Sequence, residues 1–159
     1  MTAVDAPRRA VVPHRAPHRI GDPWHHILVA SDGRPTSTAA ITRALDLARR
    51  DGAALTIVIA QPIDGPGLHV DRPVPAAVEV LVERGRAAGL RVGVDVRRGA
   101  AGQAIVEAAG ELDADLIVVE RHGRRLDMPS GTATCGYVLT HSDRPVLVVQ
   151  PWAPEGGTE

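Results

Sequence analysis

The sequence predicts an α/β domain with a doubly wound, five-stranded parallel sheet, and three observations support this prediction. Five short apolar runs alternate along the chain with segments whose apolar residues recur at helical spacing. Hydrophobic residues make up 44% of the chain but aromatic residues only 2%, so Val, Leu, Ile and Ala must form the core. The 159 residues suffice for one domain with a buried core. Right-handed crossovers would place helices on both faces of the sheet.

The five apolar runs define the expected strands. Leu116–Val119 and Val146–Val149 are wholly apolar, which is typical of strands buried on both faces. Arg91–Arg97 instead alternates valine with polar residues or glycine, which favours a half-buried strand at a sheet edge. The expected strands are Ile27–Ser31, Leu55–Gln61, Arg91–Arg97, Leu116–Glu120 and Val146–Gln150.

Amphipathic segments between the strands predict the helices. Thr36 or Ser37 can cap a helix that reaches about Arg50, with Gly52 as its stop. Two further helices are expected over 75–88 and 102–112, and a short one between the last two strands. Their inward faces are expected to carry Ile41, Ala44, Leu45 and Ala48, then Val78, Leu81 and Val82, then Ile105, Ala108 and Leu112.

The chain ends differ in composition from this central part. Residues 1–23 are polar, basic and interrupted by proline, with neither helical nor strand period, so we expect a disordered arm. That arm is either a solvated tail or a contact for an acidic partner. The α/β domain is expected over 24–152, followed by a C-terminal tail over 153–159.

Composition excludes several classes of function. The net charge of −1 gives no support for nucleic-acid binding, and no apolar run approaches the ~20 residues of a membrane span. The single cysteine, Cys135, excludes an internal disulfide, and we expect a cytoplasmic protein with this cysteine buried on the last helix. All 18 basic residues are arginine, so every mechanism that needs a lysine is excluded. Backbone N–H groups, hydroxyls or arginines must therefore hold any phosphate.

Four segments resemble the universal stress protein family. They are ILVASDGR at 27–34, LTIVIAQP at 55–62, RRGAAGQAIVEAAGELDADLIVVERHGR at 97–124 and THSDRPVLVV at 140–149. The arrangement A-x-E-x-x-A-D-L-I-V at 109–118 is fairly specific. The resemblance covers nearly the whole domain. It implies the adenine nucleotide alpha hydrolase-like fold with strand order 3-2-1-4-5, and a homodimer through the strand around Val146–Val149.

Many members of that family bind ATP through an Asp after the first strand and the pattern G-x-x-G-x9-G-(S/T) after the fourth. Asp32 and Gly123 match this pattern, but Glu120 stands in place of the first glycine. The final pair is either Gly131-Thr132, which only seven residues separate from Gly123, or Thr132-Ala133 when counted back from Pro145 before the last strand. The resemblance implies a nucleotide site at Asp32, Ala60, Gly123, Gly131 and Thr132.

Glu120 makes ATP a candidate cofactor rather than an established one, because a carboxylate near phosphate adds bulk and repulsion. In the implied strand order, Asp32 and Glu120 leave neighbouring strands, so they predict two carboxylates that share a proton or a cation such as Mg²⁺. In the alternative, Glu120 points away and pairs with Arg121, Arg124 or another arginine, and Asp32 only forms a turn with Gly33.

No constellation for nucleophilic catalysis stands out, and we expect no catalytic residue. His122 is expected to face solvent in the loop, and His25 and His26 look like surface residues rather than a metal pair. The expected function is that of a stress-response regulator that binds nucleotide weakly, or partner proteins that the sequence does not identify. A nucleotide-independent dimeric scaffold and a slow ATPase are the alternatives. We expect neither nucleic acid nor a membrane as partner.

Overall fold

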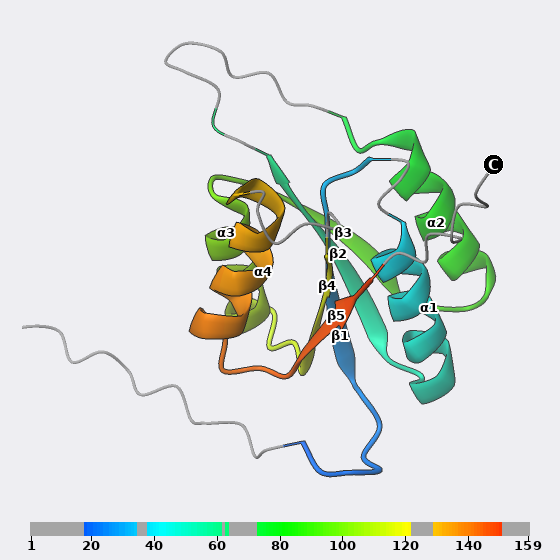
Figure 1. Cartoon of the computed structure of the whole chain (residues 1–159). Coiled ribbons are helices and arrows are strands. Elements are labelled where there is room, and N and C mark those ends of the chain that lie inside the picture. The colour runs from blue at the N-terminus through cyan, green and yellow to red at the C-terminus, as the bar shows by residue number, and fades with distance from the viewer. Residues whose placement is uncertain (1–17, 35–37, 62, 64–72, 122–128, 151–159) are drawn as a thin grey trace, which may run out of the picture.

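The computed structural model describes residues 18–34, 38–61, 63, 73–121 and 129–150 (Figure 1). Within these residues, strands and helices alternate as the sequence predicts, with small shifts at their ends. In chain order they are β1 (His26–Ser31), α1 (Ala39–Asp51), β2 (Ala54–Gln61), α2 (Ala76–Ala87), β3 (Val92–Arg98), α3 (Ala101–Glu111), β4 (Leu116–Glu120), α4 (Pro129–His141) and β5 (Val146–Val149).

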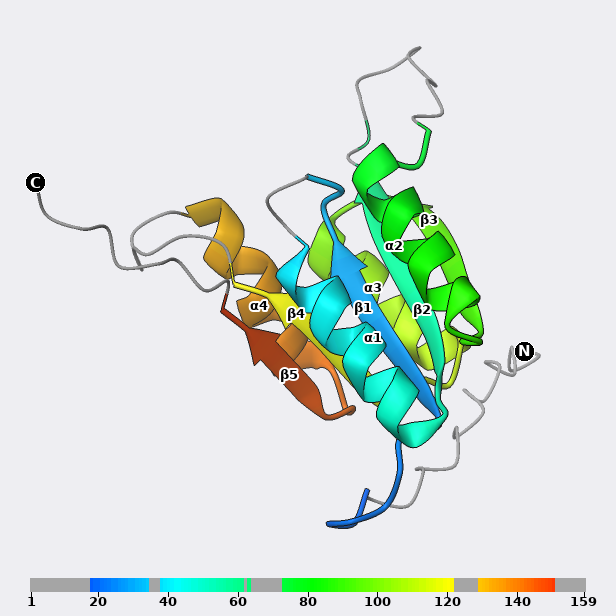
Figure 2. The ribbon, with the colours of Figure 1, turned by 90° about the vertical axis from the view of Figure 1, so that its right-hand side faces the viewer.

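The strands form one parallel sheet in the order β3-β2-β1-β4-β5, which confirms the predicted topology. β1 lies at the centre, where Val29 pairs with Ile57 of β2 on one side and with Val118 of β4 on the other. Its residues Ile27 and Leu28 are fully inaccessible to solvent. Figure 2 shows β3 and β5 at the two outer edges of this sheet.

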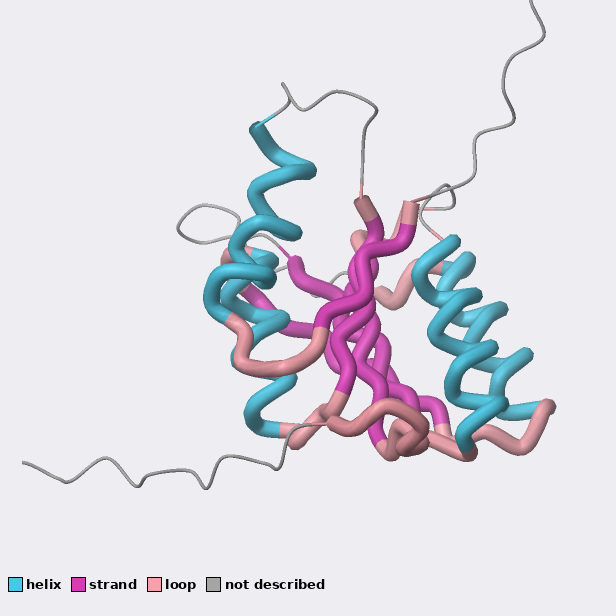
Figure 3. Tube along the Cα trace, turned by 60° about the horizontal axis from the view of Figure 1, so that its bottom comes forward, coloured by secondary structure: helices cyan, strands magenta, loops and turns pink. Residues whose placement is uncertain are grey.

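Helices cover both faces of the sheet, as Figures 1 and 3 show. α1 and α2 pack on one face and α3 and α4 on the other. α1, α2 and α3 do so through apolar residues that their sequence period predicts, whereas α4, which is 13 residues long rather than short, packs through Cys135 and Val138. Successive residues of β1 divide between the two cores, because side chains alternate along a strand: Ile27 and Val29 belong to the core on the side of α1 and α2, and Leu28 belongs to the core on the other side. The core is therefore two apolar layers separated by the sheet.

The expected stop of the first helix is confirmed. Gly52 adopts a left-handed conformation with φ of 69°, and its N–H donates to the carbonyl oxygen of Ala48. At the other end, Thr38 precedes the helix, and no side-chain cap bond is found there within the described part of the chain. The two capping residues expected from sequence, Thr36 and Ser37, lie outside the described residues.

The two edge strands differ in how they meet solvent. In β3, Val92 is buried but Val96 is 41% exposed, so the alternating pattern does mark an edge strand. In β5, Leu147 and Val149 pack against one core and Val146 and Val148 against the other, although each stays half-buried. β5 is thus an apolar edge on both of its faces.

The chain ends are described only in part. Residues 18–23 include a turn in which the Asp22 N–H donates to the Arg19 carbonyl oxygen, while 1–17 and 151–159 lie outside the described residues. The arm and tail expected from sequence therefore stay predictions. Among the described residues, no helix is both long and apolar enough to cross a membrane.

Candidate functional site

The candidate site lies at the carboxyl end of the sheet, where β1 and β4 are neighbours. After β1 the chain continues to β2 on one side of this pair, and after β4 it continues to β5 on the other side. Connections that diverge in this way leave a crevice beyond the carboxyl ends of the two strands. The segments that leave β1 and β4 therefore define the site.

The segment after β1 is a tight turn held by side chains. The Asp32 Oδ1 accepts the Arg34 N–H at 2.9 Å, and its Oδ2 lies 3.4 Å from the Arg34 Nε. The Gly33 N–H donates to the Ser31 Oγ at 3.0 Å. The turn expected of Asp32 is therefore present, and 33% of its side chain stays exposed at this end of the sheet.

Gly33 explains how this turn sits against the rest of the domain. Its φ of +76° lies in the left-handed region, which glycine adopts without the cost that a side chain would add. A Cβ atom on Gly33 would lie 2.4 Å from the Cγ of Pro75, the residue that precedes α2. Close packing on α2 thus fixes the direction in which Asp32 leaves β1.

Glu120, the last residue of β4, is turned inward. It is only 7% exposed, and its Oε2 accepts the Ala40 N–H in the first turn of α1 at 3.0 Å. That turn carries no acidic residue and gets no side-chain cap from Thr38 among the described residues. A carboxylate is favourable at this position because the first N–H groups of a helix lack partners and carry partial positive charge. Glu120 caps α1 from a different strand.

The sequence did not predict this contact. It left two positions open for Glu120, one beside Asp32 and one paired with an arginine, whereas the structure shows a bond to a backbone N–H that is 80 residues away. The absence of an acid or asparagine at the start of α1 was the one signal of a distant cap. A bridging cation between Asp32 and Glu120 stays a prediction.

The end of β4 is held firmly around Glu120. The Arg121 N–H donates to the Val149 carbonyl oxygen at 2.8 Å, which ties the chain to β5. On the α4 side, the Cys135 thiol donates to the Glu120 carbonyl oxygen at 3.4 Å. Burial raises the pKa of this thiol, and the positive charge of Arg121 opposes that rise in part. The cysteine is buried on the last helix, as expected from sequence.

The structure brings most of the described site residues to one end of the sheet. Ala60 lies near the carboxyl end of β2, half-buried and paired with Arg97 of β3. Gly131 and Thr132 lie within the first turn of α4, whose amino end follows the carboxyl end of β4 in the chain. Gly123 and the loop histidine at 122 lie outside the described residues.

Comparison with known families decides the identity of this fold. The model of the universal stress protein family matches residues 23–150. The chain belongs to the universal stress protein family. Comparison with curated proteins finds no match.

Solved structures of universal stress proteins share the fold. One, in complex with cAMP, is 28% identical with a TM-score of 0.65, and the match covers 81% of this chain and 98% of that one. A family member from Burkholderia pseudomallei is 25% identical with a TM-score of 0.55, covering 83% and 99%. Another from Archaeoglobus fulgidus, in complex with dAMP, is 23% identical with a TM-score of 0.59, covering 79% and 98%.

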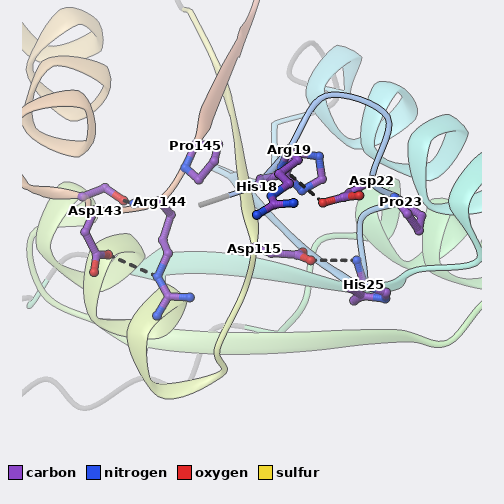
Figure 4. Close-up of a pocket in the computed structure, with 10 residues that line it drawn as sticks. His18, Arg19, Asp22, Pro23, His25, Asp115, Asp143, Arg144 and Pro145 are labelled. Carbon is purple, nitrogen blue, oxygen red and sulfur yellow. Dashed lines mark hydrogen bonds and ion pairs between the residues drawn. The ribbon is translucent and has the colours of Figure 1, made fainter. Parts of the chain in front are cut away.

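The opposite, amino end of the sheet in this universal stress protein contains a cavity of about 780 Å³ (Figure 4). The acidic side chains that line it form hydrogen bonds with other groups of the chain. The Asp115 carboxylate accepts the N–H groups of His25 and His26 at 2.8 and 2.9 Å. The cavity is lined by His18, Arg19, Asp22, Pro23, His25, Asp115, Ser142, Asp143, Arg144 and Pro145.

Arg144 lines the same cavity and joins two loops. Its guanidinium contacts the Asp143 and Asp113 carboxylates and donates to the Ala114 carbonyl oxygen at 2.7 Å. The loop before β5 is thereby fastened to the loop before β4. The bonds of Asp115 and Arg144 thus join the segments that precede β1, β4 and β5 around the cavity.

One expectation about this end was wrong. His25 is exposed, as expected, but His26 is half-buried: its Nδ1 lies 3.0 Å from the Leu112 carbonyl oxygen and its Nε2 lies 2.8 Å from the Thr56 Oγ1. The ring therefore bridges β2 and the end of α3, which chain neighbours of His26 could not reveal. Within the described residues no group of three metal-ligating side chains is found, and a role for Mg²⁺ stays a prediction.

A second aspartate fastens the entry to β1. The Asp51 Oδ2 accepts the Trp24 N–H at 3.0 Å, and its Oδ1 lies 2.6 Å from the Arg50 Nε. The bond from Arg50 and that from the Trp24 N–H lower the pKa of Asp51 to about 2. His18 stacks on Trp24 with ring centroids 3.6 Å apart, which places residue 18 against the same junction.

Proposed function

We propose that this universal stress protein binds an adenine nucleotide in the crevice beyond the carboxyl ends of β1 and β4. The observation that carries the proposal is the cAMP complex of a universal stress protein that is 28% identical and matches 81% of this chain. The dAMP complex of a second member of the same fold supports it. The proposed role is regulation by binding, with no catalytic residue assigned.

The described residues suit parts of such a ligand. The Asp32 carboxylate is one-third exposed and lies in a turn held by its bond to the Arg34 N–H, and a carboxylate can accept hydrogen bonds from ribose hydroxyls. Ala60 is small and half-buried near the end of β2, which leaves room for a base beside it. The amino end of α4, with Gly131 and Thr132, offers N–H groups to a phosphate. ATP, with or without Mg²⁺, is one candidate among these nucleotides.

The test is direct binding of adenosine, cAMP, AMP and ATP, with and without Mg²⁺, measured by calorimetry. Ala60→Trp should abolish binding because the indole fills the space beside the crevice. Leu139→Trp is the matched control, since Leu139 is 55% exposed on α4. Phosphate release in the same samples separates binding from slow hydrolysis. Failure of every nucleotide to bind the native chain would overturn the proposal.

A nucleotide-independent dimeric scaffold is the second candidate, and β5 favours it. This edge strand is apolar toward both faces and half-buried at each residue, and such an edge invites pairing with another copy. We expect a twofold homodimer with Val146–Val149 in the interface.

Leu147→Arg should dissociate this homodimer, whereas Val96→Arg on the opposite edge strand should leave it intact. Sedimentation velocity measures the mass, and circular dichroism verifies that each variant is folded. A native chain that sediments as a monomer at high micromolar concentration would contradict the dimer.

A further inference from the structure

We infer that Glu120 is a built-in anion at the amino end of α1, and that it makes the crevice select adenosine or a singly charged nucleotide over ATP. The inference rests on the proposed function and names the ligand class for that site. It follows from the burial of Glu120, its bond to α1 and the charge that this places beneath the crevice.

The carboxylate occupies a position suited to a ligand anion. Backbone N–H groups at a helix amino end attract phosphate, and the Ala40 N–H of α1 is one of them. Here that N–H donates to the Glu120 Oε2 at 3.0 Å. A phosphate can accept this N–H only after Glu120 has moved away from it.

Glu120 is poorly placed to move. Only 7% of Glu120 is exposed to solvent. Its backbone pairs with Val149 of β5, and its carbonyl oxygen accepts the Cys135 thiol at 3.4 Å. The first turn of α1 has no acid of its own to replace the carboxylate. Displacing Glu120 would therefore remove the cap from α1 as well as uncover a charge.

The charge of Glu120 penalises highly charged ligands most. A cyclic monophosphate carries one negative charge and ATP carries about four. Glu120 therefore repels ATP most and the cyclic monophosphate less, and it does not repel uncharged adenosine. Two described arginines at this end of the sheet oppose the repulsion in part. Arg34 of the β1 turn is 77% exposed and lies against Asp32, so solvent screens its charge. Arg121 follows Glu120 in the chain, and its positive charge also acts on Cys135. A buried carboxylate is screened less.

The experiment compares two variants at position 120 with one elsewhere. Glu120→Gln keeps an oxygen that can accept the Ala40 N–H but loses the charge, and Glu120→Gly restores the family glycine. Glu107→Gln makes the same change in net charge at an exposed residue of α3, where the carboxylate contacts only Gln103 among the described residues. Affinities for adenosine, cAMP and ATP are measured by calorimetry at one ionic strength.

Glu120→Gln is expected to tighten ATP binding by about tenfold, which corresponds to about 1.4 kcal/mol, cAMP binding by about twofold, and adenosine binding by less. Glu107→Gln should leave all three affinities unchanged. If Glu120→Gln changes ATP and adenosine affinity by the same factor, the inference is wrong while nucleotide binding stands. If neither the native chain nor either Glu120 variant binds any of the three ligands, the proposed function and this inference fail together.

Discussion

The two ends of the sheet use the same kinds of polar side chain for different purposes. At the amino end, Asp115 accepts two N–H groups from the chain entering β1, and Arg144 joins the loops before β4 and β5. At the carboxyl end, Asp32 contacts Arg34 within its own turn. The bonds of Asp115 connect segments about 90 residues apart and those of Arg144 connect segments about 30 residues apart, whereas the bonds between Asp32 and Arg34 connect near neighbours in the chain.

This difference separates stability from binding. Bonds between distant segments are lost only when the strands come apart, so they stabilise the whole sheet. A side chain held within its own turn keeps its direction but adds little to the stability of the sheet. Glu120 combines the two roles, because its carboxylate caps α1 from a distant strand and yet lies at the carboxyl end. Mutations at the amino end of the sheet should therefore lower the stability of the fold, and mutations at the carboxyl end should change the affinity for ligand.

The largest expected effect is at Asp115. Asp115→Ala removes a buried carboxylate that accepts two backbone N–H groups, and should lower the free energy of unfolding by about 3 kcal/mol. Asp32→Ala should lower it by less than about 1 kcal/mol, since the Asp32 side chain is one-third exposed and its contacts with Arg34 lie within one turn. Urea unfolding followed by circular dichroism measures both. Equal losses for the two variants would remove the contrast between the ends.

Gly33 tests whether the carboxyl end is also fixed by packing. Gly33→Ala places a Cβ against Pro75 and imposes a left-handed conformation on alanine, so we expect a loss of about 2 kcal/mol. Gly52→Ala is the control, because its Cβ would meet nothing within 4 Å and only the conformational cost remains. Thermal melts compare them, and a smaller loss at Gly33 than at Gly52 would show that the turn is free to move.

The sequence revealed the fold because periodicity is local. The alternation in 91–97 marked an edge strand, and Gly52 marked the end of α1, from a few neighbouring residues each. The same holds for Asp32, whose turn partners lie within two residues. Family resemblance added the strand order, which local pattern leaves open.

The contacts that the sequence missed join residues far apart in the chain. Glu120 meets Ala40, and His26 meets Leu112 and Thr56, only because the strand order brings them together. Asp115 belonged to the family motif before β4, yet nothing near it indicated that its carboxylate would fasten β1. Such contacts depend on tertiary geometry, and composition or spacing cannot supply it.

Asp51 gives the amino end a dependence on pH. Its pKa falls from an ordinary value of 3.8 to about 2 on folding, so its contribution is complete above about pH 4 and is lost as the pH falls through 2. Because Arg50 is exposed and solvent screens its charge, we expect the ionised Asp51 to add only about 1 kcal/mol to the free energy of unfolding. The free energy of unfolding of the native chain should exceed that of Asp51→Asn by this amount at pH 6, by less at pH 2 and by nothing near pH 1. A constant difference in urea unfolding across this range would contradict the assignment.

Cys135 reports how the carboxyl end opens. Its thiol is buried against Glu120 and its pKa is raised, so reaction with a disulfide reagent at neutral pH should be slow and should speed up as the pH rises. If the carboxyl end opens locally, the rate does not depend on global stability. Asp115→Asn, which weakens only the amino end, should then leave the rate within about twofold of the native chain. A rate that rises in proportion to the unfolding constant of this variant would mean that the thiol is exposed only by global unfolding, and that the two ends open as one unit.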